Sequence, residues 1–129
     1  MQIERKIDSV ARVVTLTVSG DLGDQELLGL ADELAKAPEF DRDFSLLIDL
    51  RQANGKSVTS AGVRKLVEQP LVLSAASRRA VVVPTNLGFG MARMYEMLRQ
   101  NRGGATRAFR DYDEAQRWIT TGVPVASKT

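Results

Sequence analysis

Residues 44–66 read FSLLIDLRQANGKSVTSAGVRKL, and the rest of the chain can be understood around this stretch. It begins as an apolar run from Phe44 to Leu50, continues through a polar segment, and enters a second element with a clear helix start. Where a strand leads to a helix N-terminus, unpaired backbone N–H groups and the positive end of the helix dipole come together. Ligands of α/β proteins often bind at such places, so we expect the functional site here.

Length and composition indicate one ordinary globular domain. The chain has 129 residues, of which 43% are hydrophobic, enough to bury a substantial core. We expect a single domain over residues 1–121 and a flexible tail over residues 122–129. The charged N-terminus does not resemble a secretory signal, and no apolar run approaches the ~20 residues of a transmembrane helix. We therefore expect a soluble, cytoplasmic protein with no transmembrane segment.

The sequence contains neither cysteine nor histidine. This excludes disulfides, thiolate nucleophiles, most zinc sites and the usual general base near neutral pH. We therefore expect no catalytic residues, no metal and no cofactor, and so no enzyme. A carboxylate enzyme built on Asp49 stays open as a third hypothesis, although an Asp at a strand end more often orders the loop beside it.

Charge is unevenly distributed along the chain, with an acidic first part and a basic second part. The simplest interpretation is a mixed, solvated surface, and the alternative is two faces of opposite sign that meet different partners. Nucleic-acid binders usually add exposed aromatic residues or a groove-reading helix to their basic residues. With 5% aromatic residues and no such motif, we expect no nucleic-acid partner.

Periodicity predicts the order of secondary structure. Apolar alternation and short apolar runs predict strands over residues 2–8, 13–19, 44–50, 80–83 and 106–109. Apolar stripes and caps predict helices over residues 24–37, from 59 to before 70, 87–100 and 111–119. Residues 20–23 should break the second strand, with Asp24 capping the helix after it, and residues 51–60 should form a loop. The order β-β-α-β-α-β-α-β-α predicts an α/β fold with a single five-stranded mixed sheet. The sheet should be mostly parallel, with an antiparallel N-terminal edge strand and helices packed on it.

The first candidate site is the start of the helix capped by Thr59. Ser60 lies in its first turn, where the helix dipole would stabilise a phosphate, so Ser60 is a candidate phosphoacceptor. Serine is also common at helix starts for structural reasons alone, and both interpretations stay open. The segment Gly55-Lys56-Ser57 is not a P-loop, because the first glycine of that motif is replaced by Leu50.

The second candidate site is the start of the helix near Leu87. Its glycines would let an anionic headgroup approach the backbone, and a tight turn is the alternative explanation. Both helix starts follow adjacent strands of the predicted sheet, so they should border one crevice. Four residues expected to gather there are Arg51, Lys56, Thr85 and Arg93. The full set of candidate partner- or ligand-binding residues is Asp49, Arg51, Lys56, Ser57, Thr59, Ser60, Gly62, Thr85, Asn86, Gly88, Gly90 and Arg93.

The segments 46–50 and 58–66 resemble the strand, loop and helix start of STAS domains, which include the anti-sigma-factor antagonists. The resemblance covers roughly residues 13–119. The chain, including GFGMARMYEM and the segment 38–40, is also similar to the stand-alone, uncharacterised SpoIIAA-like bacterial proteins that are grouped with STAS and Sec14 lipid-binding domains. In the antagonists this helix opens with an acidic residue, a phosphorylatable Ser, a Ser or Thr, and Gly. Here Ser60 and Gly62 match that pattern, but Thr59 replaces the acidic residue.

Two functions follow as expectations. The resemblance implies a small regulatory or protein-interaction module that acts through residues 51–66, with a protein partner such as an anti-sigma-factor or kinase-like regulator. The alternative is a binding domain for a small anionic or lipid-like ligand at the helix N-termini near residues 59 and 87.

Overall fold

The computed structural model describes residues 1–35, 43–69, 77–100 and 105–121. The expected flexible tail at 122–129 and the segment 38–40 lie outside the described residues. The elements, in chain order, are β1 (Gln2–Asp8), β2 (Val13–Gly23), α1 (Asp24–Ala35), β3 (Ser45–Ser57), α2 (Ser60–Glu68), β4 (Arg78–Val82), α3 (Asn86–Arg99), β5 (Ala105–Phe109) and α4 (Tyr112–Thr121).

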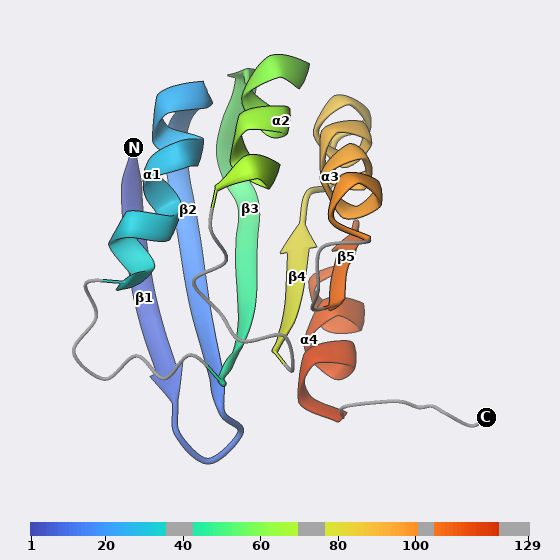
Figure 1. Ribbon diagram of the computed structural model, residues 1–129. Helices are drawn as coiled ribbons and strands as arrows, with labels where there is room; N and C mark the ends of the chain where they lie inside the picture. The colour runs from blue at the N-terminus through green and yellow to red at the C-terminus, as the bar shows by residue number, and fades with distance from the viewer. Residues whose placement is uncertain (36–42, 70–76, 101–104, 122–129) are drawn as a thin grey trace.

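The five strands form one sheet in the order β1-β2-β3-β4-β5 (Figure 1). Strand β1 pairs antiparallel with β2, and the remaining neighbours are parallel. A helix follows each of the strands from β2 onward, as parallel neighbours require a crossover connection. The predicted fold class, including the antiparallel first strand, is confirmed.

Helices cover both faces of the sheet. Figure 1 shows α1, α2 and α3 side by side, and contacts join α1 to α2 and α2 to α3. Neighbouring residues of a strand point to opposite faces. Accordingly, Leu46 packs with Val14 and Leu16 of β2, whereas Leu47 belongs to the cluster that contains Ala115 of α4. Helix α4 therefore covers the face opposite to the other three helices.

Strand β1 is an edge strand, as predicted. Its Ile3 and Ile7 are half-buried against the core, while Glu4, Arg5 and Lys6 are exposed. Charges along an edge discourage pairing with a further chain.

Strands β2 and β3 both extend beyond their predicted ends. Within the loop expected over residues 51–60, residues 51–57 instead continue β3, and residues 52–57 pair with residues 19–23 of β2. The expected strand break at residues 20–23 is therefore also wrong. The extension has no apolar alternation because most of its side chains are exposed. Polar contacts connect it to β2 instead, as when Asn54 Nδ2 donates to Asp21 Oδ1 at 3.1 Å. Register shifts and the positive φ of Gly20 (89°) accommodate the irregular pairing.

The helix starts lie within a residue or two of their predicted positions. Thr59 is the N-cap of α2, and its Oγ1 accepts a hydrogen bond from the N–H of Gly62 at 3.1 Å. Helix α3 begins at Asn86, and Thr85 caps it by accepting from the N–H of Gly88 at 3.1 Å. Asp24, predicted to cap the first helix, is the first residue of α1, and its carboxylate is directed to Thr59.

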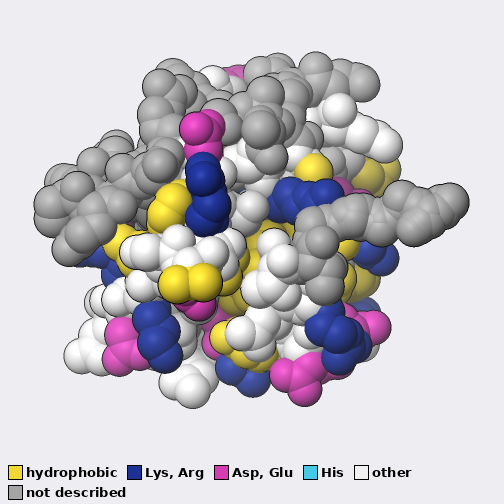
Figure 2. Space-filling view, turned by 90° about the horizontal axis from the view of Figure 1, so that it is seen from below, with side chains coloured by type: hydrophobic (Ala, Val, Ile, Leu, Met, Phe, Trp, Pro, Cys, Tyr) yellow, Lys and Arg dark blue, Asp and Glu magenta, His cyan; other side chains and the backbone are white. Residues whose placement is uncertain are grey.

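Charged side chains are intermixed on the surface at the end of the sheet where β3 and β4 begin. Figure 2 shows basic and acidic side chains there with small hydrophobic areas between them. On this face, the described basic and acidic side chains are therefore mixed and do not form a surface of one charge.

Candidate functional site: a pocket beneath α2

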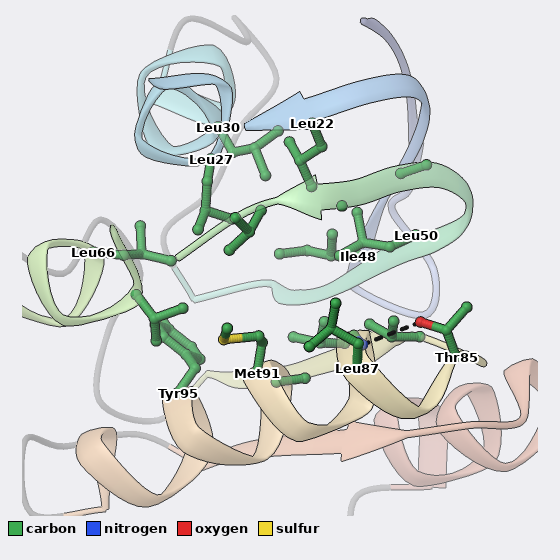
Figure 3. Close-up of a pocket in the computed structure, with 18 of the residues that line it drawn as sticks. Leu22, Leu27, Leu30, Ile48, Leu50, Leu66, Thr85, Leu87, Met91 and Tyr95 are labelled. Atoms are coloured by element: carbon green, nitrogen blue, oxygen red, sulfur yellow. Dashed lines mark hydrogen bonds between the residues drawn. The ribbon is translucent and has the colours of Figure 1, made fainter. Parts of the chain in front are cut away.

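Helix α2 lies over the sheet but packs chiefly on its neighbouring helices. Its main contacts are with α1 and α3, and its contacts with the strands are few. Between the helices and the sheet lies a pocket of about 340 Å³ (Figure 3). This volume is at the lower end of the ~300–1,000 Å³ typical of small-molecule sites.

The pocket is lined mainly by large apolar side chains from every surrounding layer. Figure 3 shows leucines of α1 and α2 facing the side chains of β3 and α3 across the pocket. The apolar lining includes Leu22, Leu27, Leu30, Leu46, Ile48, Leu50, Val63, Leu66, Val81, Val83, Leu87, Met91 and Tyr95.

Sequence periodicity explains how these side chains meet. Leu46, Ile48 and Leu50 alternate along β3 and so share the face turned toward the pocket. Met91 and Tyr95 are four residues apart in α3, which places them on one side of the helix. Met91 and Tyr95 thus line an open space beside the sheet.

Both predicted helix starts border this pocket. Val58 lines it just before the N-cap of α2, and Thr85 and Gly88 line it at the N-terminus of α3. The adjacent parallel strands β3 and β4 bring the two starts together. Lys56 and Thr85 are exposed at this end, and Leu87 is 58% exposed, so this end communicates with solvent.

The opposite end of the pocket is formed by three polar residues that sequence reasoning missed: Gln69, Arg79 and Arg99. Both arginines are only 4% exposed. Arg79 Nε donates to Thr106 Oγ1 at 3.0 Å, and Arg99 Nη1 donates to the carbonyl of Val67 at 3.0 Å. Burial lowers the pKa of Arg79, and the positive charge of nearby Arg99 lowers it further. The only sequence signal for Arg79 is a charge at the start of an otherwise apolar strand.

At the start of α2, an acidic group arrives from a distant part of the chain. The N–H of Thr59 donates to Asp24 Oδ1 at 2.8 Å, and Thr59 Oγ1 donates to Oδ2 at 2.6 Å. The hydrogen bond from the Thr59 hydroxyl, and to a lesser extent the one from its N–H, lower the pKa of Asp24. A Cβ on Gly62 would collide with the Asp24 carboxylate, so this glycine is explained by close approach. No acidic residue precedes Ser60 in the sequence, but the fold places the carboxylate of Asp24 against Thr59, next to Ser60.

Asp49 and Arg51 form a contact on the side of α4. Arg51 Nε and Nη2 donate to the two carboxylate oxygens of Asp49 at 2.9 and 2.8 Å. The guanidinium lies 4.4 Å from the ring centre of Tyr112. Burial raises the pKa of Asp49, but the hydrogen bonds and charge of Arg51 outweigh it, so the pKa is lowered overall. Arg51 borders the pocket, but its guanidinium contacts Asp49 and Tyr112 on the side of α4.

The remaining predicted site residues are dispersed. Ser57 and Ser60 are exposed, and Asn86 Oδ1 accepts from Arg110 at 2.9 Å. Arg93 does not join Arg51, Lys56 and Thr85 at the crevice, because it forms an ion pair with Glu96 beside a separate small hollow.

The glycines at the start of α3 have different surroundings. A Cβ on Gly88 would collide with the side chain of Val83, so the absence of a side chain allows the first turn of α3 to lie close to Val83, just after β4. A Cβ on Gly90 would meet open space. Within the described ranges, no group of three or more acidic side chains is arranged to hold a metal ion.

The strand order, the antiparallel first strand and the distribution of helices on two faces define a SpoIIAA-like α/β fold. The same fold is found in an uncharacterised protein of the DUF3478 family from Shewanella loihica PV-4. The two chains share 17% sequence identity and a TM-score of 0.56, and the match covers 92% of each. The resemblance inferred from the sequence is thereby confirmed for the fold.

Other comparisons add no further relationship. No protein-family profile matches the chain. No curated protein matches it either. None of the described helices is both long enough and apolar enough to cross a membrane.

Proposed function

We propose that this domain binds a small, lipid-like molecule in the pocket beneath α2. The observation that carries the proposal is the volume of about 340 Å³ lined by apolar side chains of three helices and the sheet. Apolar side chains that face an unfilled space lose dispersion contacts, and such a space holds ordered water poorly. An apolar occupant restores those contacts.

The two ends of the pocket favour an amphiphile over a pure hydrocarbon. Lys56 and Thr85 stand at the exposed end, and Arg79 and Arg99 stand at the buried end. Ligand sites typically combine an apolar lining with a few polar groups that fix orientation. The ligand that fits such a site has a chain-like apolar body with one polar terminus.

Calorimetric titration with dodecanoate and dodecanol tests the proposal, with variants that fill or spare the pocket. Met91→Trp adds bulk inside the pocket, whereas Met97→Trp adds the same bulk on the same helix at a residue that is 61% exposed. Met91→Trp should weaken binding about tenfold or more, and Met97→Trp should leave it unchanged. The proposal is wrong if a folded Met91→Trp protein binds as the wild type does, or if the wild type binds neither amphiphile.

A second candidate function is supported by the exposure of the helix start. Thr59, Ser60 and Ala61 are exposed, as are Arg64 and Lys65 on the next turn. We propose that this surface contacts a protein partner and that charge on Ser60 alters the contact. Partners captured from native cells by the wild type, Ser60→Ala and Ser60→Asp should differ. Thr120→Asp on exposed α4 is the control; identical partners for all four proteins would refute the idea.

A further inference from the structure

The buried end of the pocket contains a cation with an unused donor. Arg99 is 4% exposed, and its Nη1 donates to the carbonyl of Val67. Its Nε is buried and has no hydrogen-bond partner, and no described carboxylate forms an ion pair with it. A buried donor without an acceptor is costly, and a buried charge is more so. An acceptor of negative charge at this point would remove both penalties.

The surroundings of Arg99 favour an anion as that acceptor. Arg79 lines the same end and is buried there as well, so two positive charges are held in one poorly solvated region. Burial is the main cause of the lowered pKa of Arg79, and the charge of Arg99 adds a smaller decrease. An anion between them would reduce the repulsion.

The position of Arg99 fixes the orientation of a ligand. Arg99 is the last residue of α3, and Arg79 pairs with Leu46 at the beginning of the parallel strands. The apolar lining extends from there toward Lys56 and Thr85 at the exposed end. Exposed cations such as Lys56 are already hydrated and attract an anion weakly, whereas a buried guanidinium binds a carboxylate strongly and with two parallel hydrogen bonds.

We propose that the ligand is a fatty acid whose carboxylate lies at the buried end of the pocket against Arg99, with its alkyl chain along the leucines toward the helix starts. This inference rests on the proposed ligand-binding function and specifies the headgroup, its direction and the residue that recognises it.

Binding of dodecanoate, dodecanol, dodecyl phosphate and dodecyltrimethylammonium to the wild type is the first test. Dodecanoate should bind about tenfold more tightly than dodecanol, and the cationic amphiphile should bind most weakly. Equal binding of dodecanoate and dodecanol would overturn the headgroup assignment while leaving the pocket function intact. Tighter binding of dodecyl phosphate would also overturn it in favour of a phosphate headgroup. Failure of all four to bind would refute the pocket function itself.

Arg99→Met and Arg93→Met form a matched pair on α3. Arg99→Met should remove the preference for dodecanoate and leave dodecanol binding unchanged, which also shows that the variant is folded. Arg93→Met should retain the preference, because Arg93 is exposed and lies outside the pocket. A preserved preference in Arg99→Met would contradict the assignment.

A measurement on the wild type makes the test independent of variant folding. The carboxyl signal of ¹³C-labelled dodecanoate should titrate at lower pH when bound than when free, because a neighbouring guanidinium favours the ionised form. A bound carboxyl that titrates at or above the pH of the free acid would overturn the proposal.

Discussion

Gly88 and Gly90 are two residues apart in α3, but only Gly88 lies close to side chains outside the helix. A Cβ at Gly88 would collide with Val83, so Gly88→Ala should lower the free energy of unfolding by about 1–3 kcal/mol. Gly90→Ala meets open space and should raise it by about 0.5–1 kcal/mol through helix propensity. Urea denaturation of the two variants measures both effects. Equal effects of the same sign would show that the Val83 contact does not constrain this turn.

Asp24 gives the contact between α1 and α2 a pH dependence. Hydrogen bonds from Thr59 lower the folded-state pKa of Asp24 below its usual value of 3.8. A group with a depressed folded pKa stabilises the fold above its unfolded pKa, and this contribution is lost as the pH falls through the folded pKa. Stability should therefore decrease below about pH 4, and Asp24→Asn should make that decrease shallower. Denaturation at pH 2.5–6 measures it, and parallel curves for the two proteins would contradict this role.

Strand β3 and helix α4 are joined through Asp49, Arg51 and Tyr112. Asp49 is buried, so Arg51→Met would leave its carboxylate without its cation and should lower the free energy of unfolding by about 1–2 kcal/mol. Adding Asp49→Asn to Arg51→Met should restore part of the loss, because the amide carries no charge. A double-mutant cycle by chemical denaturation measures the coupling. Additive effects of the two substitutions would show that the pair is not coupled.

The element order was predictable because local patterns are strong in this chain. Val14, Leu16 and Val18 alternate in β2, and Thr59 caps α2 by the side-chain bond that its position suggested. The ends of β2 and β3 were not predictable. Exposed polar residues such as Gln52 and Asn54 show no alternation, and their pairing depends on a partner strand more than thirty residues earlier.

The pocket could not be derived from the sequence. In the sequence, Leu66 and Met91 fit the pattern of ordinary core residues. No local sequence pattern indicates that α2 packs mainly on two helices and leaves a space between itself and the sheet. Arg79 and Arg99 are 20 positions apart, and only the fold places both at one end of that space. The predicted helix starts do border the pocket, because adjacent parallel strands deliver their chains to the same edge.

The arrangement of layers predicts which part of the molecule opens first. Helix α2 has few contacts with the sheet, whereas β3 is paired on both sides at residues 46–49. Amides of α2 should therefore exchange with solvent hydrogen faster than those of residues 46–49. Saturating dodecanoate should slow exchange in α2 most, since the ligand fills the space beneath it. Hydrogen-exchange mass spectrometry measures this, and uniform exchange unaffected by the ligand would contradict it.

Occupancy of the pocket should also be visible in the thermal stability of the whole domain. Ligand at 100 times its Kd stabilises a folded protein by about 2.7 kcal/mol, which corresponds to a rise in Tm of roughly 10 °C for a domain of this size. Calorimetry with dodecanoate measures the shift, and Met91→Trp should show little of it. An equal shift in Met91→Trp would place the ligand elsewhere on the protein.

Adjacent residues of β3 serve separate layers: Leu46 and Ile48 face the pocket, while Leu47 faces α4. The residues that line the pocket can therefore vary during evolution while the residues that face α4 maintain the packing of the sheet. Substitution of every second residue of this strand can therefore change the lining of the pocket without changing the architecture of the domain.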